Sequence, residues 1–438
     1  MKIKSAKKAL AMLVTGGLLA MAAGCGNQRI QADSTQTGSA QVGDMASQTD
    51  PESKTVESSL ATEGTVKVGL LHSLTGSMAI SEVSVRDAEL LAIEEINAAG
   101  GVLGCQIVPF EEDGASDPSV FATKAEKLIV ETEVATVFGC WTSSSRKAVK
   151  QIFEDYESLL WYPVQYEGME ASPNIMYMGA APNQQIVPAI DYLADQGYTK
   201  FFLLGSDYVF PRTANMIIKA QVEDLGLTTV GEEYAAMDQT EFSSILAKIE
   251  EAQPDVIINT LNGASNVSFF KQLSEKNITS KELMTMSFSI AEEEVKTIGA
   301  DILSGHLVSW NYYQTTEGDR NAAFVKSYKE KFGADRVTSD PAGAAYTAVY
   351  AWAEACEAAG SFDVEAVKAA AAGLMVAAPE GDVVINGDNQ HLAKTVRIGQ
   401  VATDGLIYEI YATDGVVEPD PYLTSYEWAV QAGIQPLE

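Results

Sequence analysis

Short apolar runs alternate with amphipathic helical patterns along this chain, and this alternation constrains the fold more than any other feature. A strand, a helix and another strand at such spacing form a parallel sheet with helices on both faces. The pattern starts near Thr65 and restarts after Pro182. We therefore expect an α/β protein with two sheets, each in its own lobe. The runs expected as strands are 66–71, 106–110, 135–139 and 158–161 in the first sheet and 201–204, 255–258 and 283–286 in the second.

The restart of the pattern also predicts the lobe boundaries. About 370 residues follow the N-terminal region, which is long for a single hydrophobic core. Hinges usually lie between such segments and near strand ends, here at Pro182, at Trp310-Asn311 and at Pro379. Lobe 1 is expected to comprise residues 65–182 and 311–378, and lobe 2 residues 183–310 and 379–438.

Three helix starts can be predicted inside lobe 1. The first helix is expected from about Ser84 to Ala98, before Gly100-Gly101. Asp117-Pro118 is typical of an N-cap followed by a proline in the first turn, so a second helix should begin there. A third is expected from Ser145 to Tyr156.

The first 64 residues have the composition of an export signal and a tether. Residues 1–24 combine four lysines with the apolar stretch Ala9 to Ala23, which is shorter than a typical membrane-spanning helix. Met21-Ala-Ala-Gly-Cys25 resembles a bacterial lipobox, although Ala22 stands where leucine is usual; the alternative is an ordinary cleaved signal. Residues 25–64 have almost no large apolar side chains and are expected to be disordered. We expect a lipid on Cys25 that anchors the exported protein to the outer face of the cytoplasmic membrane.

The charge of the chain excludes several classes of partner. Without residues 1–24 it has 25 basic and 60 acidic residues, a formal charge of −35, against −31 for the whole sequence. Such a surface repels nucleic acid and anionic lipid. We therefore expect no nucleic-acid partner.

The cysteines and histidines do not indicate an enzyme. Cys140 lies at a predicted strand-helix turn and could be the nucleophile of an amidohydrolase, but such a nucleophile needs a base. The histidines are His72, His306 and His391, and their spacing assigns none of them to that role. Metal-ligand spacings are absent from the sequence as well. We expect free, mostly buried thiols at Cys105, Cys140 and Cys356, with a disulfide between Cys105 and Cys140 as the alternative. We expect no catalytic residues, no metal and no cofactor.

Aromatic and hydroxyl side chains follow two strands of the predicted first sheet. These segments are Cys140-Trp-Thr-Ser-Ser-Ser145 and Tyr162-Pro-Val-Gln-Tyr-Glu-Gly168. In open α/β sheets small ligands bind beyond the carboxyl ends of the strands. Flat rings with uncharged hydrogen-bonding groups indicate a planar, neutral, polar ligand.

Long stretches of the chain resemble the urea-binding lipoproteins of urea ABC transporters, which are type I periplasmic binding proteins of the branched-chain amino acid and amide group. The similar stretches include Gly69-Leu-Leu-His-Ser-Leu-Thr-Gly76, Phe138-Gly-Cys-Trp-Thr-Ser143, Leu160-Trp-Tyr-Pro-Val-Gln-Tyr-Glu-Gly168, Gly205-Ser-Asp-Tyr-Val-Phe-Pro-Arg212 and Asn259-Thr-Leu-Asn-Gly263. The resemblance implies two Rossmann-like lobes joined by three crossovers, which close on urea and deliver it to permease subunits with cytoplasmic ATPases. It also implies that Trp141 to Ser143, Tyr162 to Gln165 and the Tyr208 loop contact the ligand. Amide-binding relatives have Tyr and Thr where this chain has Trp141 and Val164.

The chemistry of urea selects the candidate ligand-binding residues. Urea has one carbonyl acceptor and four N–H donors, so a buried site needs many acceptors and a few donors. An amino acid would need fixed partners for both of its charges. Short-chain amides and branched-chain amino acids remain alternative ligands. A soluble amide sensor is an alternative function that the sequence favours less. The candidates are Trp141, Thr142, Ser143, Tyr162, Gln165, Glu167, Tyr208, Thr260, Asn262 and Ser287.

Overall fold

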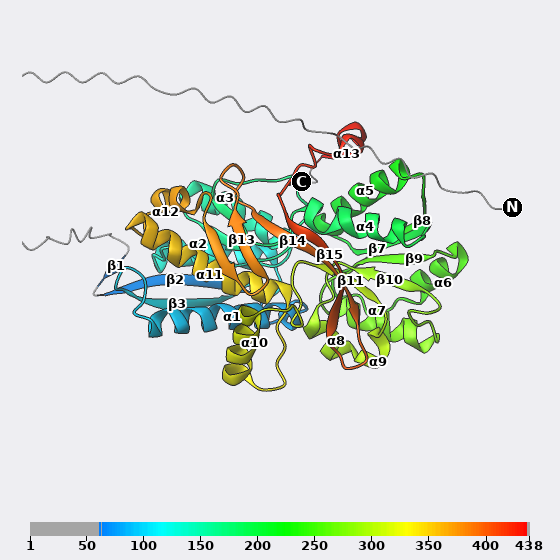
Figure 1. The fold of residues 1–438 in the computed structure, drawn as a ribbon, viewed down its shortest axis with the longest axis horizontal. Coiled ribbons are helices and arrows are strands. Elements are labelled where there is room, and N and C mark those ends of the chain that lie inside the picture. Colours follow the sequence, from blue (N-terminus) through cyan, green and yellow to red (C-terminus); the bar gives the residue numbers. More distant parts are fainter. Residues whose placement is uncertain (1–60, 63, 436–438) are drawn as a thin grey trace, which may run out of the picture. The chain divides into compact units, whose positions relative to one another are not determined.

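Two α/β lobes, each built on its own sheet, form the part of the chain that the computed structural model describes, residues 61–62 and 64–435 (Figure 1). The expected α/β class with two lobes and mainly parallel sheets is confirmed. The predicted signal 1–24, Cys25 and nearly all of the tether 25–64 lie outside the described residues.

The first sheet, in lobe 1, is parallel apart from one short edge strand. β2 lies between β3 and β4, and β5 and β6 extend the sheet beyond β4. All these pairs are parallel, whereas β1 is antiparallel to β2. The strands are β1 (Ala61–Thr62), β2 (Thr65–His72), β3 (Gln106–Asp113), β4 (Val137–Gly139), β5 (Leu160–Tyr162) and β6 (Ile175–Tyr177).

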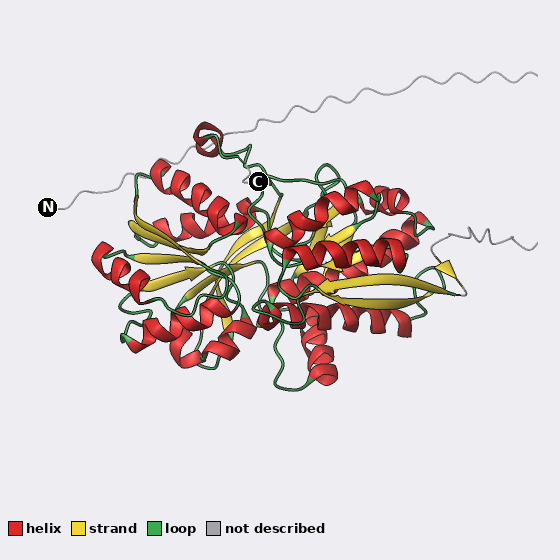
Figure 2. Ribbon diagram, turned by 180° about the vertical axis from the view of Figure 1, so that it is seen from behind, coloured by secondary structure: helices red, strands yellow, loops and turns green. Residues whose placement is uncertain are grey.

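Helices cover both faces of this sheet because successive side chains of a strand point to opposite faces. On β2, Leu70 lies in one core with Trp352 of α11, while Leu71 lies in another core with Phe121 of α2. Figure 2 shows the helical layers on the two sides of the strands. The helices of lobe 1 are α1 (Ala79–Ala98), α2 (Pro118–Glu126), α3 (Ser143–Asp155), α10 (Asp319–Phe332), α11 (Asp340–Ala359) and α12 (Val364–Ala371).

The second sheet is mixed, with a parallel centre and antiparallel strands at one end. Its order is β12-β13-β14-β11-β10-β9-β7-β8, and β15 pairs with β14. Pairs among β7 to β11 are parallel, and those among β11 to β15 are antiparallel. The strands are β7 (Lys200–Ser206), β8 (Thr228–Ala235), β9 (Val256–Thr260), β10 (Met284–Ser287), β11 (Leu307–Trp310), β12 (Met375–Ala378), β13 (Gly381–Ile385), β14 (Leu392–Val401) and β15 (Ile407–Val417).

The parallel centre of the second sheet is also covered on both faces. On β7, Phe202 packs in a core with Phe269 of α7, and the preceding Phe201 packs in another core with Ile217 of α5. The helices of lobe 2 are α4 (Ile186–Asp195), α5 (Val209–Asp224), α6 (Ser243–Ala252), α7 (Ala264–Glu275), α8 (Glu292–Ile298), α9 (Ala300–Leu303) and α13 (Glu427–Ala432).

The segment that follows the predicted boundary at Pro379 contacts both lobes. Val383 and Ile385 of β13 lie in the core of lobe 1 together with Val376 of β12, although residues 379–438 were expected in lobe 2. The reason is that β12 and β13 form an antiparallel pair whose alternating apolar side chains cover lobe 1. The hydrogen bonds of β13 nevertheless join it to β14 and thus to the second sheet.

β14 is a continuous strand that passes from one lobe to the other. Its first residue, Leu392, lies in the core of lobe 1, whereas Ile398 and Val401 lie in the cores of lobe 2. Its pairing with β15 is irregular between Thr395 and Arg397 and again after Ile398. The chain therefore crosses between lobes along a strand as well as through its loops.

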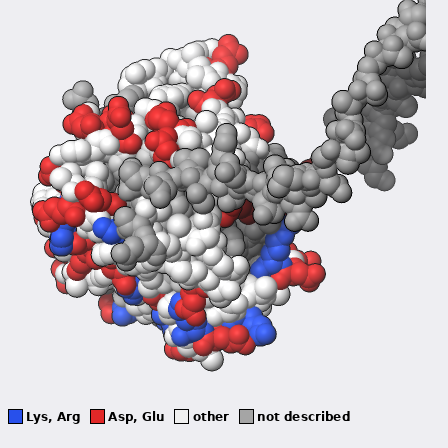
Figure 3. Space-filling model, turned by 90° about the vertical axis from the view of Figure 1, so that its left-hand side faces the viewer, with Lys and Arg blue, Asp and Glu red and all other residues white. Residues whose placement is uncertain are grey.

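Acidic residues are spread over the face of the molecule that Figure 3 draws. On the face drawn in Figure 3, acidic side chains of the described residues are scattered, and many of the basic ones lie beside them. Pairs such as Lys219 with Glu232 and Lys248 with Glu233, both at 2.6 Å, are partly exposed. Exposed pairs of this kind contribute roughly 0 to 1 kcal/mol each. The surface charge therefore favours solubility without indicating a particular partner.

Candidate functional site

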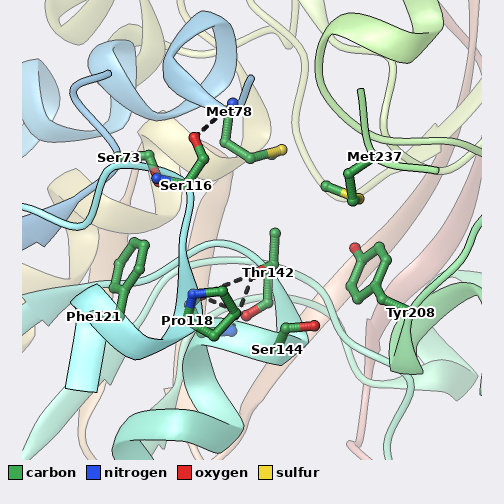
Figure 4. A pocket seen from close by; sticks show the side chains of 10 residues that line it. Ser73, Met78, Ser116, Pro118, Phe121, Thr142, Ser144, Tyr208 and Met237 are labelled. Carbon is green, nitrogen blue, oxygen red and sulfur yellow. Dashed lines mark hydrogen bonds between the residues drawn. The ribbon is translucent and has the colours of Figure 1, made fainter. Parts of the chain in front are cut away.

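A cavity of about 70 Å³ lies at the carboxyl ends of β2, β3 and β4 of lobe 1 (Figure 4). Lobe 2 contributes Tyr208 and Met237 to its wall. One water molecule needs roughly 10 to 15 Å³ of such space, so the cavity suits a ligand with only a few non-hydrogen atoms. The lining residues, none of them charged, are Ser73, Met78, Ser116, Pro118, Phe121, Thr142, Ser144, Ser145, Tyr208 and Met237.

Strand ends bring these side chains together. Ser73 directly follows β2, Ser116 follows β3 by a short turn, and Thr142 follows β4. From the other lobe, Tyr208 comes after β7 and Met237 after β8. Parallel strands end at the same edge of a sheet, which is where α/β proteins bind ligands. The cavity therefore lies where the two carboxyl edges meet.

Thr142 and Tyr208 are the two predicted site residues that line the cavity. Thr142 is the N-cap of α3, and its Oγ1 accepts the backbone N–H of Ser145 at 3.1 Å. Burial raises the pKa of Tyr208 well above its usual value, which keeps the phenol neutral and able to donate a hydrogen bond. Both residues thus offer uncharged polar groups to a ligand.

Trp141, Gln165 and Asn262 link the two lobes beside the cavity. The indole Nε1 of Trp141 lies 3.4 Å from Oδ1 of Asn262, and Nε2 of Gln165 donates to the carbonyl of Phe288 at 2.8 Å. The side-chain oxygen of Gln165 is buried and has no partner within the described residues. These three residues bridge lobe 1 and lobe 2, and their contact with a ligand stays a prediction.

Ser143, Glu167 and Tyr162 belong to a network behind the cavity wall, centred on Arg146. The guanidinium of Arg146 is buried and donates to Glu167 at 3.0 Å, to Glu170 at 2.8 Å and to Ser143 at 2.9 Å. Ser143 in turn donates to Glu167 at 2.5 Å. The polar atoms of Ser143 and Glu167 are thus engaged within the protein, and their predicted contact with ligand stays untested.

The network around Arg146 also holds Tyr162 and Tyr166 in place. Arg146 lies 5.1 Å from the ring centre of Tyr162 and 4.6 Å from that of Tyr166. The hydroxyl of Tyr162 donates to the backbone carbonyl of Trp141 at 2.5 Å. Two loops that follow different strands are thereby tied together through one buried cation. Such cation–π contacts contribute roughly 0.5 to 2 kcal/mol each.

Thr260 and Ser287 make hydrogen bonds inside lobe 2. The hydroxyl of Thr260 donates to the carbonyl of Leu204 at 3.3 Å, and Ser287 accepts from the amide of Asn259 at 3.1 Å. Neither residue lines the cavity. They shape the strand ends that carry Asn262, and direct ligand contact by them stays a prediction.

A buried histidine-glutamate cluster positions Ser73. The backbone N–H of Ser73 donates to Glu82 at 2.7 Å, and the neighbouring His72 bonds to Glu89 at 2.8 Å. Burial lowers the pKa of His72, but Glu89 and Glu82 outweigh this effect and raise it to about 9. His72 is therefore charged at neutral pH, and it neutralises part of the negative charge of Glu82 and Glu89.

Several lining residues were not among the sequence candidates, namely Ser73, Met78, Ser116, Pro118, Phe121, Ser144, Ser145 and Met237. Most of them follow the strand-end rule that identified Thr142 and Tyr208. Applying this rule to β3 and β8 as well would have found Ser116 and Met237. Phe121 gives no such signal, because it lies inside helix α2.

The lobes touch each other next to the cavity. The backbone N–H of Ala264, at the start of α7, donates to the carbonyl of Ser77 at 3.3 Å. Gly263, with a φ of +59°, precedes it and approaches Ser77 and Met78 closely. A side chain at this position would not fit, so glycine permits the close approach. The structure is accordingly a closed arrangement of the lobes.

The chain is similar to known binding proteins over nearly all of its described length. A family model described as "Periplasmic binding protein domain" matches residues 66–427. A leucine-, isoleucine-, valine-, threonine- and alanine-binding protein from Pseudomonas aeruginosa is 25% identical over 333 residues, covering 73% of this chain and 85% of that protein. A Leu/Ile/Val-binding protein homolog from Brucella abortus is 23% identical, covering 80% and 92%.

Solved structures share the fold. A solute binding protein of an ABC transporter from Rhodopseudomonas palustris, in complex with 3,4-dihydroxybenzoic acid, has a TM-score of 0.73 at 22% identity and covers 82% of this chain and 99% of its own. A leucine binding protein from Thermotoga maritima has a TM-score of 0.70 at 19% identity, covering 79% and 98%.

Proposed function

Because this chain belongs to the periplasmic binding protein family, we propose that it is the substrate-binding component of an ABC importer. It captures urea in the cavity between its lobes and delivers the urea to permease subunits driven by cytoplasmic ATPases. The observation that carries the choice of ligand is the small cavity with an uncharged lining. The long resemblance to urea-binding lipoproteins supports the same choice.

Charge favours urea over an amino acid or an aromatic acid. Leucine would need partners for an ammonium and a carboxylate, and a benzoate would need one for its carboxylate. The cation behind the wall, Arg146, is already engaged by Glu167, Glu170 and Ser143. A ligand carboxylate would have to displace one of these partners, at a cost typical of breaking a buried ion pair.

Hydroxyl groups suit the hydrogen-bonding demands of urea. Ser73, Ser116, Thr142, Ser144 and Tyr208 can each donate or accept. The hydroxyl of Ser144 forms no hydrogen bond with the described residues, so it is available to a ligand. Each polar group of a buried ligand left unpaired costs about 1 to 3 kcal/mol. Urea, with four N–H groups, should therefore bind more tightly than acetamide, which has two.

The arrangement around Cys140 supports a binding protein over an amidohydrolase. Burial raises the pKa of the Cys140 thiol, which disfavours the reactive thiolate. Within the described residues, His72 bonds to Glu89, His306 to Thr285 and His391 to Tyr166, so none of them is placed as its base. Cys140, like Cys105 and Cys356, is a free thiol.

Calorimetric titration of the purified protein tests the ligand. Urea is expected to bind more tightly than acetamide or formamide, and leucine is expected to bind weakly or not at all. Short amides and branched-chain amino acids are the alternatives, and the relatives named above make the second a definite competitor. Micromolar binding of leucine without binding of urea would contradict the proposal.

We also propose that a lipid on Cys25 is the sole membrane attachment. Within the part of the chain that the structure covers, no helix combines the length and the apolar character needed to cross a bilayer. Cys25→Ala is expected to move the exported protein from the membrane to the soluble fraction, as measured by fractionation and immunoblotting. Retention of the processed variant on the membrane would show another attachment.

A further inference from the structure

Helix α8 of lobe 2 meets helix α1 of lobe 1 through a buried hydrogen bond. The hydroxyl of Ser81 lies 2.6 Å from Oε1 of Glu294, and Oε2 of Glu294 accepts the backbone N–H of Ala291 at 3.0 Å. Ser81 is 3% exposed and Glu294 is 1% exposed. Ser81, Ala291 and Glu294 are referred to below as the interlobe latch. It buries an acidic side chain at the contact that forms when the lobes close.

The charges around the latch do not compensate a carboxylate. Among the described residues, no lysine or arginine forms an ion pair with Glu294. Arg336 instead pairs with Asp87 at 2.9 Å, and Lys296 pairs with Asp335 at 3.3 Å. The other charged residues on the elements packed against Glu294 are Glu292 and Glu293 on α8, Glu82, Arg86, Glu89, Glu94 and Glu95 on α1, Lys271 and Glu275 on α7, and Asp301 on α9.

We propose that closure of the lobes takes up a proton at the interlobe latch, so that ligand capture strengthens as the surroundings become more acidic. The proposal rests on ligand capture by lobe closure but not on the identity of the ligand. When the lobes separate, Glu294 is hydrated and ionised; when they close, an unpaired carboxylate in this contact would be costly. A neutral carboxyl avoids that cost, because its O–H can donate to the hydroxyl of Ser81.

The acidity of Glu294 agrees with this geometry. Burial raises its pKa to about 7, although the hydrogen bonds from Ser81 and Ala291 oppose the rise. A hydrated glutamate has a pKa of about 4.3. The closed form therefore binds more protons than the open form between these values. Ligand affinity is expected to fall by up to about tenfold per pH unit from about pH 5 to pH 7 and to level off above that range.

Glu292, a neighbour of Glu294, could also take up a proton, so the test must distinguish the two carboxyls. Burial also raises the pKa of Glu292, to about 8, and this side chain accepts the backbone N–H of Gln314 at 2.7 Å. A pH dependence of affinity alone could come from either residue. Counting protons in wild type and variants separates the two.

Calorimetry of the full chain in two buffers of different ionisation enthalpy counts the protons taken up on ligand binding. In wild type, the number of protons that Glu294 takes up on ligand binding is expected to be close to one at about pH 6 and close to zero at about pH 8.5. In Glu294→Gln the carboxamide can still donate to Ser81 and accept from Ala291. This variant should lose nearly all of the proton uptake that Glu294 contributes at pH 6, and its ligand affinity should depend less on pH. Unchanged proton uptake in Glu294→Gln, or no uptake in wild type, would overturn the proposal.

Two further variants sharpen the test. Ser81→Ala removes a hydrogen bond that lowers the pKa of Glu294, so the pH at which affinity falls should move upward. Lys296→Ala breaks an exposed pair between α8 and Asp335 and should leave the proton count unchanged. Equal effects of Glu294→Gln and Lys296→Ala would mean that general loosening of the contact, not the latch, is measured.

The outcome can be separated from failure of the proposed function. If leucine binds in place of urea, the same titration with leucine tests the latch. If neither binds, small-angle scattering of the ligand-free chain decides: wild type should become more compact from about pH 8 to pH 5.5, and Glu294→Gln should respond less. The same compaction in both proteins would contradict the inference.

Discussion

Replacement of Arg146 by methionine is expected to lower the free energy of unfolding by about 3 to 5 kcal/mol. The guanidinium is buried between Glu167 and Glu170, and methionine would leave both carboxylates without it. Lys147, at 3.6 Å from Glu170, is partly exposed and compensates little. Thermal or guanidinium-induced unfolding measures the loss. Urea is unsuitable as the denaturant because it is the proposed ligand.

A charge-neutral variant is the matched control for this prediction. Arg146→Met combined with Glu167→Gln and Glu170→Gln removes the cation together with both carboxylates. Because uncompensated charge is the main cost, the triple variant should recover a large part of the lost stability. If it is no more stable than Arg146→Met alone, packing of the guanidinium on Tyr162 and Tyr166, rather than charge, dominates the network.

The loss of stability at acidic pH independently tests the network of Arg146, Glu167 and Glu170. Burial opposes ionisation of Glu170, but Arg146 and Lys147 outweigh it and hold the pKa of Glu170 below its usual value. A carboxyl with a lowered pKa stabilises the folded state above its unfolded pKa of about 4.3, and this contribution is lost as the pH falls. Wild type should therefore lose stability below about pH 4.5. Arg146→Met should lose less over the same range.

Gly263→Ala is expected to weaken ligand binding by about 5- to 150-fold, which corresponds to about 1 to 3 kcal/mol of overpacking. The added Cβ would lie 2.6 Å from the carbonyl oxygen of Ser77 and 2.9 Å from the sulfur of Met78. Both atoms belong to the other lobe, so the clash exists only when the lobes are closed. Titration with urea measures the effect, and scattering of the liganded protein should show a less compact chain.

Gly226→Ala separates this clash from backbone strain. Gly226 has a φ of +69°, close to the +59° of Gly263, but no atom lies within 4 Å of a Cβ at that position. Both substitutions should lower stability through strain, and Gly263→Ala by more, because the ψ of −142° at Gly263 combines with its φ in a region open almost only to glycine. Gly263→Ala alone should lower affinity. Equal affinity losses in the two variants would show that strain within lobe 2 causes the effect.

The expected strand runs match β2, β3, β4, β5, β7, β9 and β10, because local composition determines such strands, whereas β6, β8, β11 and β15 were not predicted. Buried parallel strands are short apolar runs, and Asp117 caps α2 as expected, accepting the backbone N–H of Ser119 at 2.8 Å. The start of α1 was wrong: it was expected near Ser84, and the helix begins at Ala79. The residue before it, Met78, makes no side-chain cap, so no capping signal marks this start in the sequence.

The candidate site was only partly predictable, because convergence of loops is a tertiary property. Thr142 and Tyr208 were found from strand ends, which the sequence shows. Ser143 and Glu167 were also candidates, but they are engaged by Arg146, and a buried ion pair between residues 21 positions apart leaves no local pattern. The side chain of Met237 joins the cavity only because the second lobe closes over the first.

Strand β14 limits how this molecule can open. A loop hinge lets two bodies swing freely, whereas β14 is anchored by Leu392 in one core and by Ile398 in the other. Separation of the lobes must therefore flex a hydrogen-bonded strand, and the irregular pairing after Thr395 is where a β-strand bends most easily. We expect this strand to restrict the direction in which the lobes can separate. A stiffer β14 should then allow a smaller separation of the lobes, and with it a smaller opening for the ligand.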